Sequence, residues 1–374
     1  MSVLVTGATG FIGREVMRRL VAAGRAVVAL ARSGSTVPAI ERVSAALGGV
    51  PPGTALEVVE GDLTLPECGL SREDWRRLRA TVETVLYCAG DTRFEPVAMT
   101  PYVAGHVHGP LCLLQGLAGG RLVHWAHLST AFVCGRRSGT IFESEGDVGQ
   151  AFNNTYERVK LEAERAIRSA GVHLGVDVRV FRPSIVVGAA PATAGGNPSN
   201  LFFGFIRMLT TLAQVADSAR LRIAAAPRAR FNIVPVEYVA TALLALSERA
   251  DAAGATVHLI VRDTPTQEVI LRMITEHLGV RGVSLVDARV DQLADPTHFE
   301  RVLARALEPY RAYLTQDACF DDATATRLLA RCGIERPTLS AGALRRLIDQ
   351  ALVSEDAEPG RLDLQGLTRG ADTY

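Results

Sequence analysis

Hydrophobic positions follow two alternating patterns along the first half of the chain. Short apolar runs rich in β-branched residues occur at residues 3–6, 26–30, 56–59, 82–86, 122–127 and 176–181. Several are followed by stretches whose apolar residues recur at helical spacing, as at Val16, Met17 and Leu20. Apolar strands that alternate with amphipathic helices are typical of βαβ units. The pattern therefore predicts an α/β fold, a doubly wound parallel sheet with helices on both faces.

Three glycines spaced three residues apart separate the first predicted strand from the first predicted helix. Gly7 suits a sharp turn, Gly10 allows the backbone to approach a pyrophosphate, and Gly13 allows the helix to pack closely on the sheet. The helix that follows offers unpaired N–H groups to phosphate. The turn is a candidate dinucleotide site, with a purely structural turn as the alternative.

The end of the second predicted strand bears on the choice of cofactor. A carboxylate near this position binds the ribose 2′-hydroxyl of NAD, whereas a cation suits the 2′-phosphate of NADP. The sequence here is Ala31-Arg32-Ser33, which offers a cation and a hydroxyl and no carboxylate. It favours NADPH, unless Arg32 is simply a solvated side chain.

Two further groups are placed for chemistry. The strand predicted over 122–127 is followed by Ser129 and Thr130 at its carboxyl end, where ligands bind in open parallel sheets. Tyr156 and Lys160 lie one turn apart on a predicted helix, 156–170, and so share a face. A nearby ammonium lowers the pKa of a phenol and makes it a usable acid or base. On spacing alone, an exposed surface pair is the alternative.

The strand predicted over 82–86 is followed by Cys88-Ala89-Gly90, small residues that would let the backbone lie against a flat cofactor or simply pack at a strand end. The next helix, predicted near 103–117, contains His106 and His108. Residues two apart point to different helix faces, so no metal site is expected there.

The second half of the chain predicts a mixed region. Residues 189–200 are rich in Ala, Gly and Pro and predict a mobile loop, and the apolar helix over 201–212 either packs in the core or lines an apolar substrate channel. A helix over 239–246 and strand–helix pairs around Val257 and Val283 follow. A helical C-terminal part is expected to hold Tyr310, Tyr313, Phe320 and Leu328.

The predicted domains follow from these patterns. Residues 1–190 form an NADP-binding domain to which 231–260 return, and residues 191–230 and 261–353 form a substrate-binding part. The polar tail 354–374 has little to bury and is expected to be disordered.

Composition excludes several classes of protein. The 374 residues include 40 Lys+Arg and 40 Asp+Glu, and a neutral chain without basic runs argues against nucleic acid or an anionic membrane as partner. No apolar run is long enough to span a bilayer, and no signal peptide is expected, because the glycine turn lies near the first residue. The six scattered cysteines indicate reduced thiols and a cytoplasmic protein. The oligomeric state is not predicted.

Residues 2–260 resemble the extended short-chain dehydrogenase/reductase family. Thr6-Gly7-Ala8-Thr9-Gly10-Phe11-Ile12-Gly13 is similar to its TGxxGxxG loop, Gly61-Asp62-Leu63 to its adenine-contacting segment, Tyr156–Lys160 to YxxxK, and Arg182-Pro183 to the motif beside the nicotinamide. The resemblance implies a Rossmann fold. Aligned on Gly135, Thr130 rather than Ser129 falls at the catalytic Ser/Thr position. The implied cofactor contacts are Gly7, Thr9, Gly10, Phe11, Ile12, Gly13, Arg32, Ser33, Asp62, Leu63, Cys88, Ala89, Gly90, Tyr156, Lys160, Pro183 and Ser184.

Within that family the chain resembles the fatty acyl reductase and thioester reductase branch, through residues 128–133, 182–188 and 233–240. That branch uses NADPH to reduce acyl thioesters, on CoA or on a carrier protein, to aldehydes or alcohols. The resemblance implies that Tyr156 and Thr130 stabilise and protonate the oxyanion. Lys160 would hold the nicotinamide ribose and depress the pKa of Tyr156. No carrier domain is expected in this chain, so its thioester is expected to arrive on CoA or on a separate carrier protein.

One segment departs from the family pattern. Where the family has Asn-Val-x-Gly-Thr, with the Asn in a water-mediated proton relay, this chain has His106-Val107-His108-Gly109-Pro110. His106 carries a relay proton under one hypothesis and is a packed core histidine under the other. Three other functions share this framework: an NAD(P)-dependent carbonyl/hydroxyl oxidoreductase, a sugar-nucleotide epimerase and a non-catalytic NADP-sensing protein.

Overall fold

The computed structural model describes residues 2–94, 98–188, 202, 204, 206, 221–288 and 293–353, with the backbone alone at 351 and 353. The chain divides into two compact units. Unit 1 comprises Met1–Gly188, Ile233–Arg262 and Cys319–Thr338; unit 2 comprises Ala189–Asn232, Asp263–Ala318 and Leu339–Tyr374. The predicted division assigns Cys319–Thr338 to the substrate-binding part, whereas these residues belong to unit 1. The loop predicted over 189–200, most of the helix predicted over 201–212 and the tail 354–374 lie outside the described residues.

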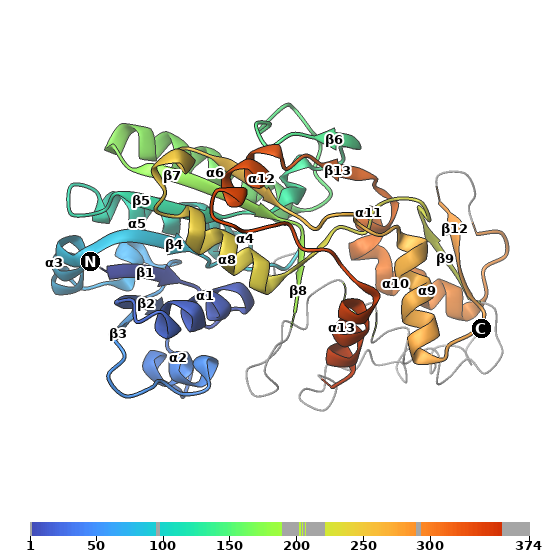
Figure 1. The fold of residues 1–374 in the computed structure, drawn as a ribbon, viewed down its shortest axis with the longest axis horizontal. Helices are drawn as coiled ribbons and strands as arrows, with labels where there is room; N and C mark the ends of the chain where they lie inside the picture. The colour runs from blue at the N-terminus through green and yellow to red at the C-terminus, as the bar shows by residue number, and fades with distance from the viewer. Residues whose placement is uncertain are drawn as a thin grey trace. The chain divides into compact units, whose positions relative to one another are not determined.

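Unit 1 is built on a parallel sheet (Figure 1). Within the described residues seven strands lie in the order β11-β7-β5-β4-β1-β2-β3. Their bounds are β1 (Ser2–Thr6), β2 (Val27–Ala31), β3 (Leu56–Glu60), β4 (Val82–Tyr87), β5 (His124–Leu128), β7 (Asp177–Pro183) and β11 (Thr256–Leu259). The strand order reverses between β1 and β4, which is the switch point of a doubly wound sheet. The predicted Rossmann-type α/β fold is confirmed.

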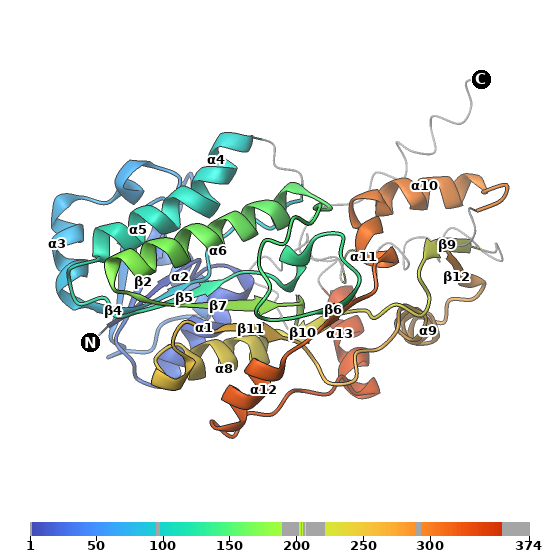
Figure 2. The same ribbon diagram turned by 90° about the horizontal axis from the view of Figure 1, so that it is seen from above.

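Helices cover both faces of this sheet (Figure 2). One face carries α1 (Phe11–Ala22), α2 (Ala39–Leu47), α8 (Val236–Leu246) and α12 (Ala323–Ala330). The other carries α3 (Arg72–Thr81), α5 (Gly109–Leu117) and α6 (Thr155–Leu174). Alternate residues of a strand pack on opposite faces of the sheet. Val3 and Val5 pack in the same cluster as Met17 of α1, whereas Leu4 packs in the same cluster as Leu78 of α3. This two-sided burial explains why the strands are continuous apolar runs.

Shorter elements complete unit 1. They are α4 (Met99–Val103), a π-helical turn at Ala104–His108, the 3₁₀ turns Pro66–Gly69, Ala131–Cys134 and Ala250–Ala252, and the two-stranded pairs β6 (Gly139–Ile141) with β13 (Ala318–Phe320) and β8 (Ile185–Val187) with β10 (Ile233–Pro235). The expectation that Phe320 lies in a helix is wrong. A three-residue strand is too short for its periodicity to be recognised, and Phe320 instead packs edge-on against Phe132.

Unit 2 contains the parallel pair β9 (Leu221–Ala225) and β12 (Val283–Asp287) with helices α9 (Gln267–Leu278), α10 (His298–Leu307), α11 (Arg311–Thr315) and α13 (Ala341–Val353) and the 3₁₀ turn Glu308–Tyr310. Buried Glu300 caps α10 together with Thr297 and also pairs with Arg222 at 2.7 Å, which fixes α10 to β9. Among the residues described in both units, no helix is both long and apolar enough to cross a membrane.

Candidate functional site

The glycine turn after β1 is a place of very close backbone packing. Gly7 adopts a φ of +67°, and a Cβ there would come within 2.8 Å of the Ala89 backbone. A Cβ on Gly13 would lie 2.1 Å from the Gly7 carbonyl oxygen. These two positions therefore require glycine, because the turn is compressed between the end of β4 and the first turn of α1.

The start of α1 has the features of an anion site. Gly10 is its N-cap residue, no side chain caps the helix, and no acidic residue occupies the first turn. The unpaired N–H groups and the positive end of the helix dipole remain available to a phosphate.

A cavity of about 480 Å³ opens beside this turn. Nine of the predicted cofactor residues line it: Gly7, Thr9, Gly10, Arg32, Asp62, Leu63, Cys88, Ala89 and Gly90. Phe11, Ile12, Gly13 and Ser33 do not line it, nor do Tyr156, Lys160, Pro183 and Ser184. The structure adds lining residues that the sequence did not single out, among them Arg42, Asp91 and Arg93.

The far end of the cavity, at the ends of β2 and β3, has a different charge balance from the one predicted. Although no carboxylate follows β2, Asp62 from the end of β3 lies 3.7 Å from the Arg32 guanidinium. Arg42 of α2 supplies a second cation and donates to the Arg32 carbonyl oxygen. The Ser33 hydroxyl accepts a hydrogen bond of 3.1 Å from the Ala39 N–H at the start of α2. Two arginines and one carboxylate thus meet at this end of the cavity.

Buried hydroxyls lie at the carboxyl ends of β5 and β7. Thr130 is 6% exposed, and its hydroxyl accepts from the Phe132 N–H at 3.3 Å. The hydroxyls of Ser129 and Ser184, 3% and 4% exposed, have no hydrogen-bond partner. Buried hydroxyls without partners carry a desolvation cost that a bound polar ligand would remove. These hydroxyls do not line the cavity, whereas the glycine turn does, and together with the uncapped start of α1 it fits the phosphates of a nicotinamide dinucleotide.

Tyr156 and Lys160 lie in the first turns of α6. The helix begins after Asn154, whose side chain accepts from the Glu157 N–H at 3.0 Å. Lys160 is 5% exposed, its Nζ donates to the Leu128 carbonyl oxygen at 2.9 Å, and it lies 5.9 Å from the centre of the Tyr156 ring. The Lys160 ammonium therefore bridges α6 to the end of β5, where Thr130 follows.

Burial determines the protonation of this pair. Desolvation lowers the pKa of Lys160 to about 8, with the Glu164 carboxylate opposing the shift. Desolvation also raises the pKa of Tyr156, and Glu157 adds to that rise. The expectation that Lys160 depresses the pKa of Tyr156 is thus wrong for this structure, because burial outweighs any effect of the ammonium. A phenol in this environment stays protonated and is suited to donate a proton.

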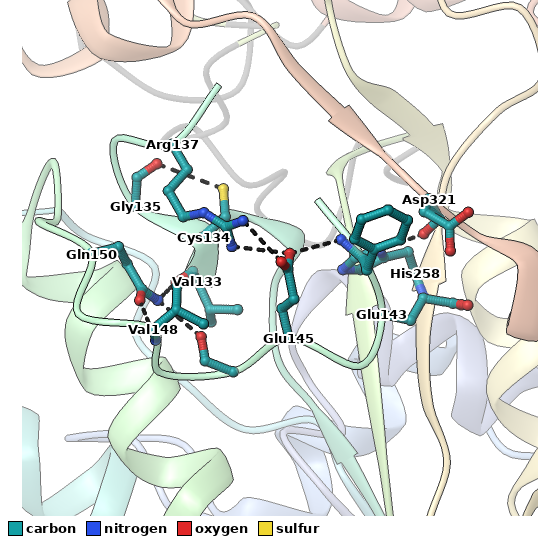
Figure 3. Close-up of polar contacts among 12 residues, drawn as sticks. Val133, Cys134, Gly135, Arg137, Glu143, Glu145, Val148, Gln150, His258 and Asp321 are labelled. Carbon is teal, nitrogen blue, oxygen red and sulfur yellow. Dashed lines mark hydrogen bonds and ion pairs between the residues drawn. The ribbon is translucent and has the colours of Figure 1, made fainter. Parts of the chain in front are cut away.

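The segment between Thr130 and Tyr156 is fixed by polar contacts (Figure 3). Arg137 and Glu145 face one another and pair at 3.0 Å, and the Gln150 side chain donates to the Val133 carbonyl oxygen at 2.9 Å. Glu143 is 3% exposed, and its carboxylate accepts from three backbone N–H groups, those of His258, Thr324 and Ala325.

The contacts of Glu143 tie distant parts of unit 1 together. Thr324 and Ala325 form the first turn of α12, so the carboxylate lies where the helix dipole favours negative charge. His258 belongs to β11, and its imidazole contacts the Asp321 carbonyl oxygen at 2.6 Å. The segment that joins Thr130 to Tyr156 is thereby held to the edge strand and to the returning segment Cys319–Thr338. No sequence signal indicated this role, because the partners lie far away along the chain.

The family comparison agrees with this site. A nicotinamide-binding Rossmann unit with a Tyr–Lys pair at its carboxyl edge is the arrangement of an extended short-chain oxidoreductase. The family model described as Male sterility protein matches residues 5–243, and the chain belongs to this family, in the thioester reductase-like branch of the extended short-chain dehydrogenase/reductases.

Individual relatives have low sequence identity to this chain. The chain is 26% identical over 294 residues to a carboxylic acid reductase of Mycobacterium marinum (strain ATCC BAA-535 / M), a match that covers 69% of this chain but 24% of that protein. It thus spans about a quarter of that relative's length.

Two solved structures share the fold. The terminal R domain from the myxalamid PKS-NRPS biosynthetic pathway matches with a TM-score of 0.77 at 20% identity, covering 96% of this chain and 92% of that one. MoeE5 in complex with UDP-glucose and NAD matches with a TM-score of 0.67 at 19% identity, covering 95% and 100%. At such identities these likenesses establish the fold alone.

The Glu143 contacts generate a stability prediction. Glu143→Gln removes the charge that three N–H donors share and turns an amide N–H toward at least one of them. We expect a loss of about 2 kcal/mol, since hydrogen bonds to charged groups contribute about 1.5–3 kcal/mol. Thermal unfolding should show a lower Tm. Glu162→Gln, at a half-exposed carboxylate 4.0 Å from Arg158, is the matched control and should leave Tm unchanged. Equal Tm values for wild type and Glu143→Gln would contradict the assigned role.

Proposed function

We propose that this protein is an NADPH-dependent reductase of an acyl thioester, carried on CoA or on a separate carrier protein. The product is the aldehyde, and a second reduction would give the alcohol. The balanced reaction consumes one NADPH and one proton and releases NADP⁺, the aldehyde and a free thiol.

One observation carries the proposal. Lys160 and Tyr156 of α6 lie beside the end of β5, where Thr130 follows, next to the cavity that the glycine turn lines, in a chain of the thioester reductase-like branch. The carboxylic acid reductase among its relatives supports reduction at the acyl level.

The residues divide the chemistry between them. NADPH, when bound, supplies the hydride to the carbonyl carbon. Desolvation raises the pKa of Tyr156, so the phenol stays protonated and would donate to the developing oxyanion, with the buried Thr130 hydroxyl as second donor. Lys160 would hold the nicotinamide ribose, because its ammonium lies beside Gly90 at the edge of the cavity. Loss of the thiol from the resulting hemithioacetal gives the aldehyde.

The preference for NADPH rests on two arginines. Arg32 and Arg42 both line the far end of the cavity, and two guanidinium groups suit a 2′-phosphate better than a ribose hydroxyl. Asp62 near Arg32 reduces but does not cancel this positive charge. We further propose that unit 2 binds the acyl group, since the cavity and the Tyr–Lys pair belong to unit 1.

The reaction itself is tested with a panel of substrates. Acyl-CoA or acyl-carrier thioesters should support NADPH oxidation with stoichiometric release of free thiol, followed together by NADPH absorbance and a thiol reagent. Simple ketones and nucleotide sugars should not. Oxidation of NADPH by a ketone, with no thiol from any thioester, would assign the protein to the ordinary carbonyl reductases.

Cofactor preference is tested with charge variants. NADPH should bind at least about tenfold more tightly than NADH, or about 1.4 kcal/mol. Arg32→Glu should abolish or reverse that ratio through repulsion of the 2′-phosphate, and Arg42→Ala should reduce it. Arg76→Ala, at an exposed position on α3, is the control and should not change it. The ratio comes from fluorescence titration of both cofactors, and equal affinities in wild type would refute the assignment.

The proton donor is tested by removal of one oxygen. Tyr156→Phe keeps the ring, so NADPH affinity should survive while turnover falls by roughly 10²–10⁴-fold. Tyr238→Phe is the matched control, because the buried Tyr238 hydroxyl on α8 has no hydrogen-bond partner and its loss should not affect turnover. Near-full activity of Tyr156→Phe would show that another group donates the proton.

A further inference from the structure

The helix that carries His106 is not regular. Between α4 and α5 it passes through a π-helical turn, Ala104–His108, in which the Gly109 N–H donates to the Ala104 carbonyl oxygen, five residues back. The cause lies just beyond the turn. Pro110 has no N–H, and in an α-helix its ring would press on the carbonyl of His106, four residues earlier. A widened turn before the proline relieves this clash, and π turns of this kind are frequent at functional sites.

The widened turn releases a carbonyl that another residue takes up. In a regular helix the Gly105 carbonyl oxygen would accept from the Gly109 N–H. Here it accepts from the Tyr87 hydroxyl at 3.0 Å. Tyr87 is 1% exposed and ends β4, immediately before Cys88 and the cavity-lining turn that follows. This hydrogen bond therefore ties the π turn to the end of β4, which precedes the cavity-lining residues Cys88, Ala89 and Gly90.

His106 points from this turn onto the main chain at the cavity wall. It is 3% exposed, and its Nε2 lies 2.9 Å from the carbonyl oxygen and 3.1 Å from the amide nitrogen of Asp91. A Cβ on Gly90 would come within 3.0 Å of the imidazole and 3.3 Å of the Lys160 amine. Gly90, Asp91 and His106 all line the cavity.

The surroundings keep this imidazole neutral. Desolvation, with the Lys160 ammonium adding to it, lowers the pKa of His106 to about 3. Asp91 opposes that shift only in part, since its carboxylate pairs with Arg93. Further titratable neighbours are the phenols of Tyr102 and Tyr156, whose rings lie 4.7 and 6.1 Å from the imidazole and whose pKa values are raised. The buried His127 imidazole also interacts with His106, and desolvation, with the Lys160 and His106 charges adding to it, lowers the pKa of His127. Both neutral tautomers of His106 have a partner at Asp91. An unprotonated Nε2 accepts from the Asp91 N–H, and a protonated Nε2 donates to the Asp91 carbonyl oxygen.

We propose that His106 is a positioning residue for cofactor binding: its Nε2 holds the Gly90–Asp91 main chain at the cavity wall, and the π turn before Pro110 sets its position. The proposal rests on the proposed function for the identity of the cofactor. It assigns His106 to the geometry of the NADPH site and removes it from the path of the substrate proton.

The test uses side chains that do or do not reach Asp91. The amide of Gln can occupy the place of Nε2, whereas Asn is too short and Leu has no polar atom. His106→Gln should bind NADPH within about threefold of wild type, and His106→Asn and His106→Leu should bind it about tenfold more weakly, as loss of one buried hydrogen bond implies. Exposed His108→Gln, on the same helix, is the matched control and should not change the affinity. Fluorescence titration of NADPH gives these values without any substrate.

Two further readouts separate positioning from proton transfer. At saturating NADPH the variants should keep kcat within a few-fold, with the same pH profile between pH 6 and 9. Stability should depend on pH in a defined direction. Because the folded pKa of His106, about 3, lies below the unfolded value of 6.5, the unfolded state binds more protons between them. The contribution of His106 to the free energy of unfolding of the wild type therefore falls as the pH decreases from 6.5 to about 3. The Tm of His106→Gln relative to wild type should therefore rise from pH 7 to pH 5.

The outcomes are distinct. Equal NADPH affinity in wild type and His106→Leu, or a loss in His106→Gln as large as in His106→Leu, overturns the proposal, as does a shifted pH profile of kcat. If His106→Leu does not fold, the comparison of Gln with Asn decides. Wild type that binds NADPH but reduces no thioester would refute the proposed function while the affinity series still tests His106.

Discussion

The ion pair between Arg182 and Glu164 is the interaction on which the arrangement of the site depends. Both side chains are 3% exposed, and the guanidinium engages the carboxylate through two bonds, Nε at 3.0 Å and Nη2 at 2.6 Å. The remaining Nη1 donates to the Glu145 carbonyl oxygen at 2.7 Å. Such complete pairing is what makes two buried charges tolerable, since each alone would cost several kcal/mol. The pair joins the end of β7, the helix α6 and the segment before α6 in one rigid contact.

Charge at the candidate catalytic residues follows from that contact. Glu164 lies one turn beyond Lys160 on α6 and raises the Lys160 pKa, partly offsetting the burial that lowers it to about 8. Arg182 neutralises Glu164, so the carboxylate stabilises the ammonium without presenting an excess negative charge to Tyr156. Burial then favours the neutral form of the phenol. This charge distribution supports the proposed roles of a cation that holds a ribose and a protonated phenol that donates to a carbonyl.

Local constraints were predictable from the sequence, whereas contacts between distant segments were not. The glycine turn could be predicted because Gly13 packs on the Gly7 carbonyl within one βα unit, and the Tyr156–Lys160 pair because four residues make about one helical turn. The close approach of Gly7 to the Ala89 backbone at the end of β4 could not be predicted. Glu143 could not, because its donors at Thr324 and Ala325 lie about 180 residues away in sequence.

For Arg42 and Pro110 the sequence indicated part of the local structure but not its consequence for the site. Arg42 lies on a helix with a weak pattern, and it joins the cavity only because the connection after β2 returns α2 to the end of that strand. Pro110 stands out in the sequence only as a departure from the family motif, and the sequence did not indicate that the helix would widen into a π turn before it. The depressed pKa expected for Tyr156 was wrong for a related reason, since spacing places a cation nearby but does not measure burial.

The three segments that resemble the thioester reductase branch form one continuous part of unit 1. Residues 128–133 and 182–188 follow the neighbouring strands β5 and β7, and the Ser129 N–H donates to the Phe181 carbonyl oxygen at 2.7 Å. Strand β8 within the second segment pairs with β10 of the third, Ile185 opposite Ile233. Cofactor-cavity residues, by contrast, all precede residue 107. With MoeE5 the chain shares the fold alone. The segments that resemble its own branch lie at and beyond the carboxyl ends of β5 and β7, where we propose that a substrate carbonyl would meet Thr130 and Tyr156.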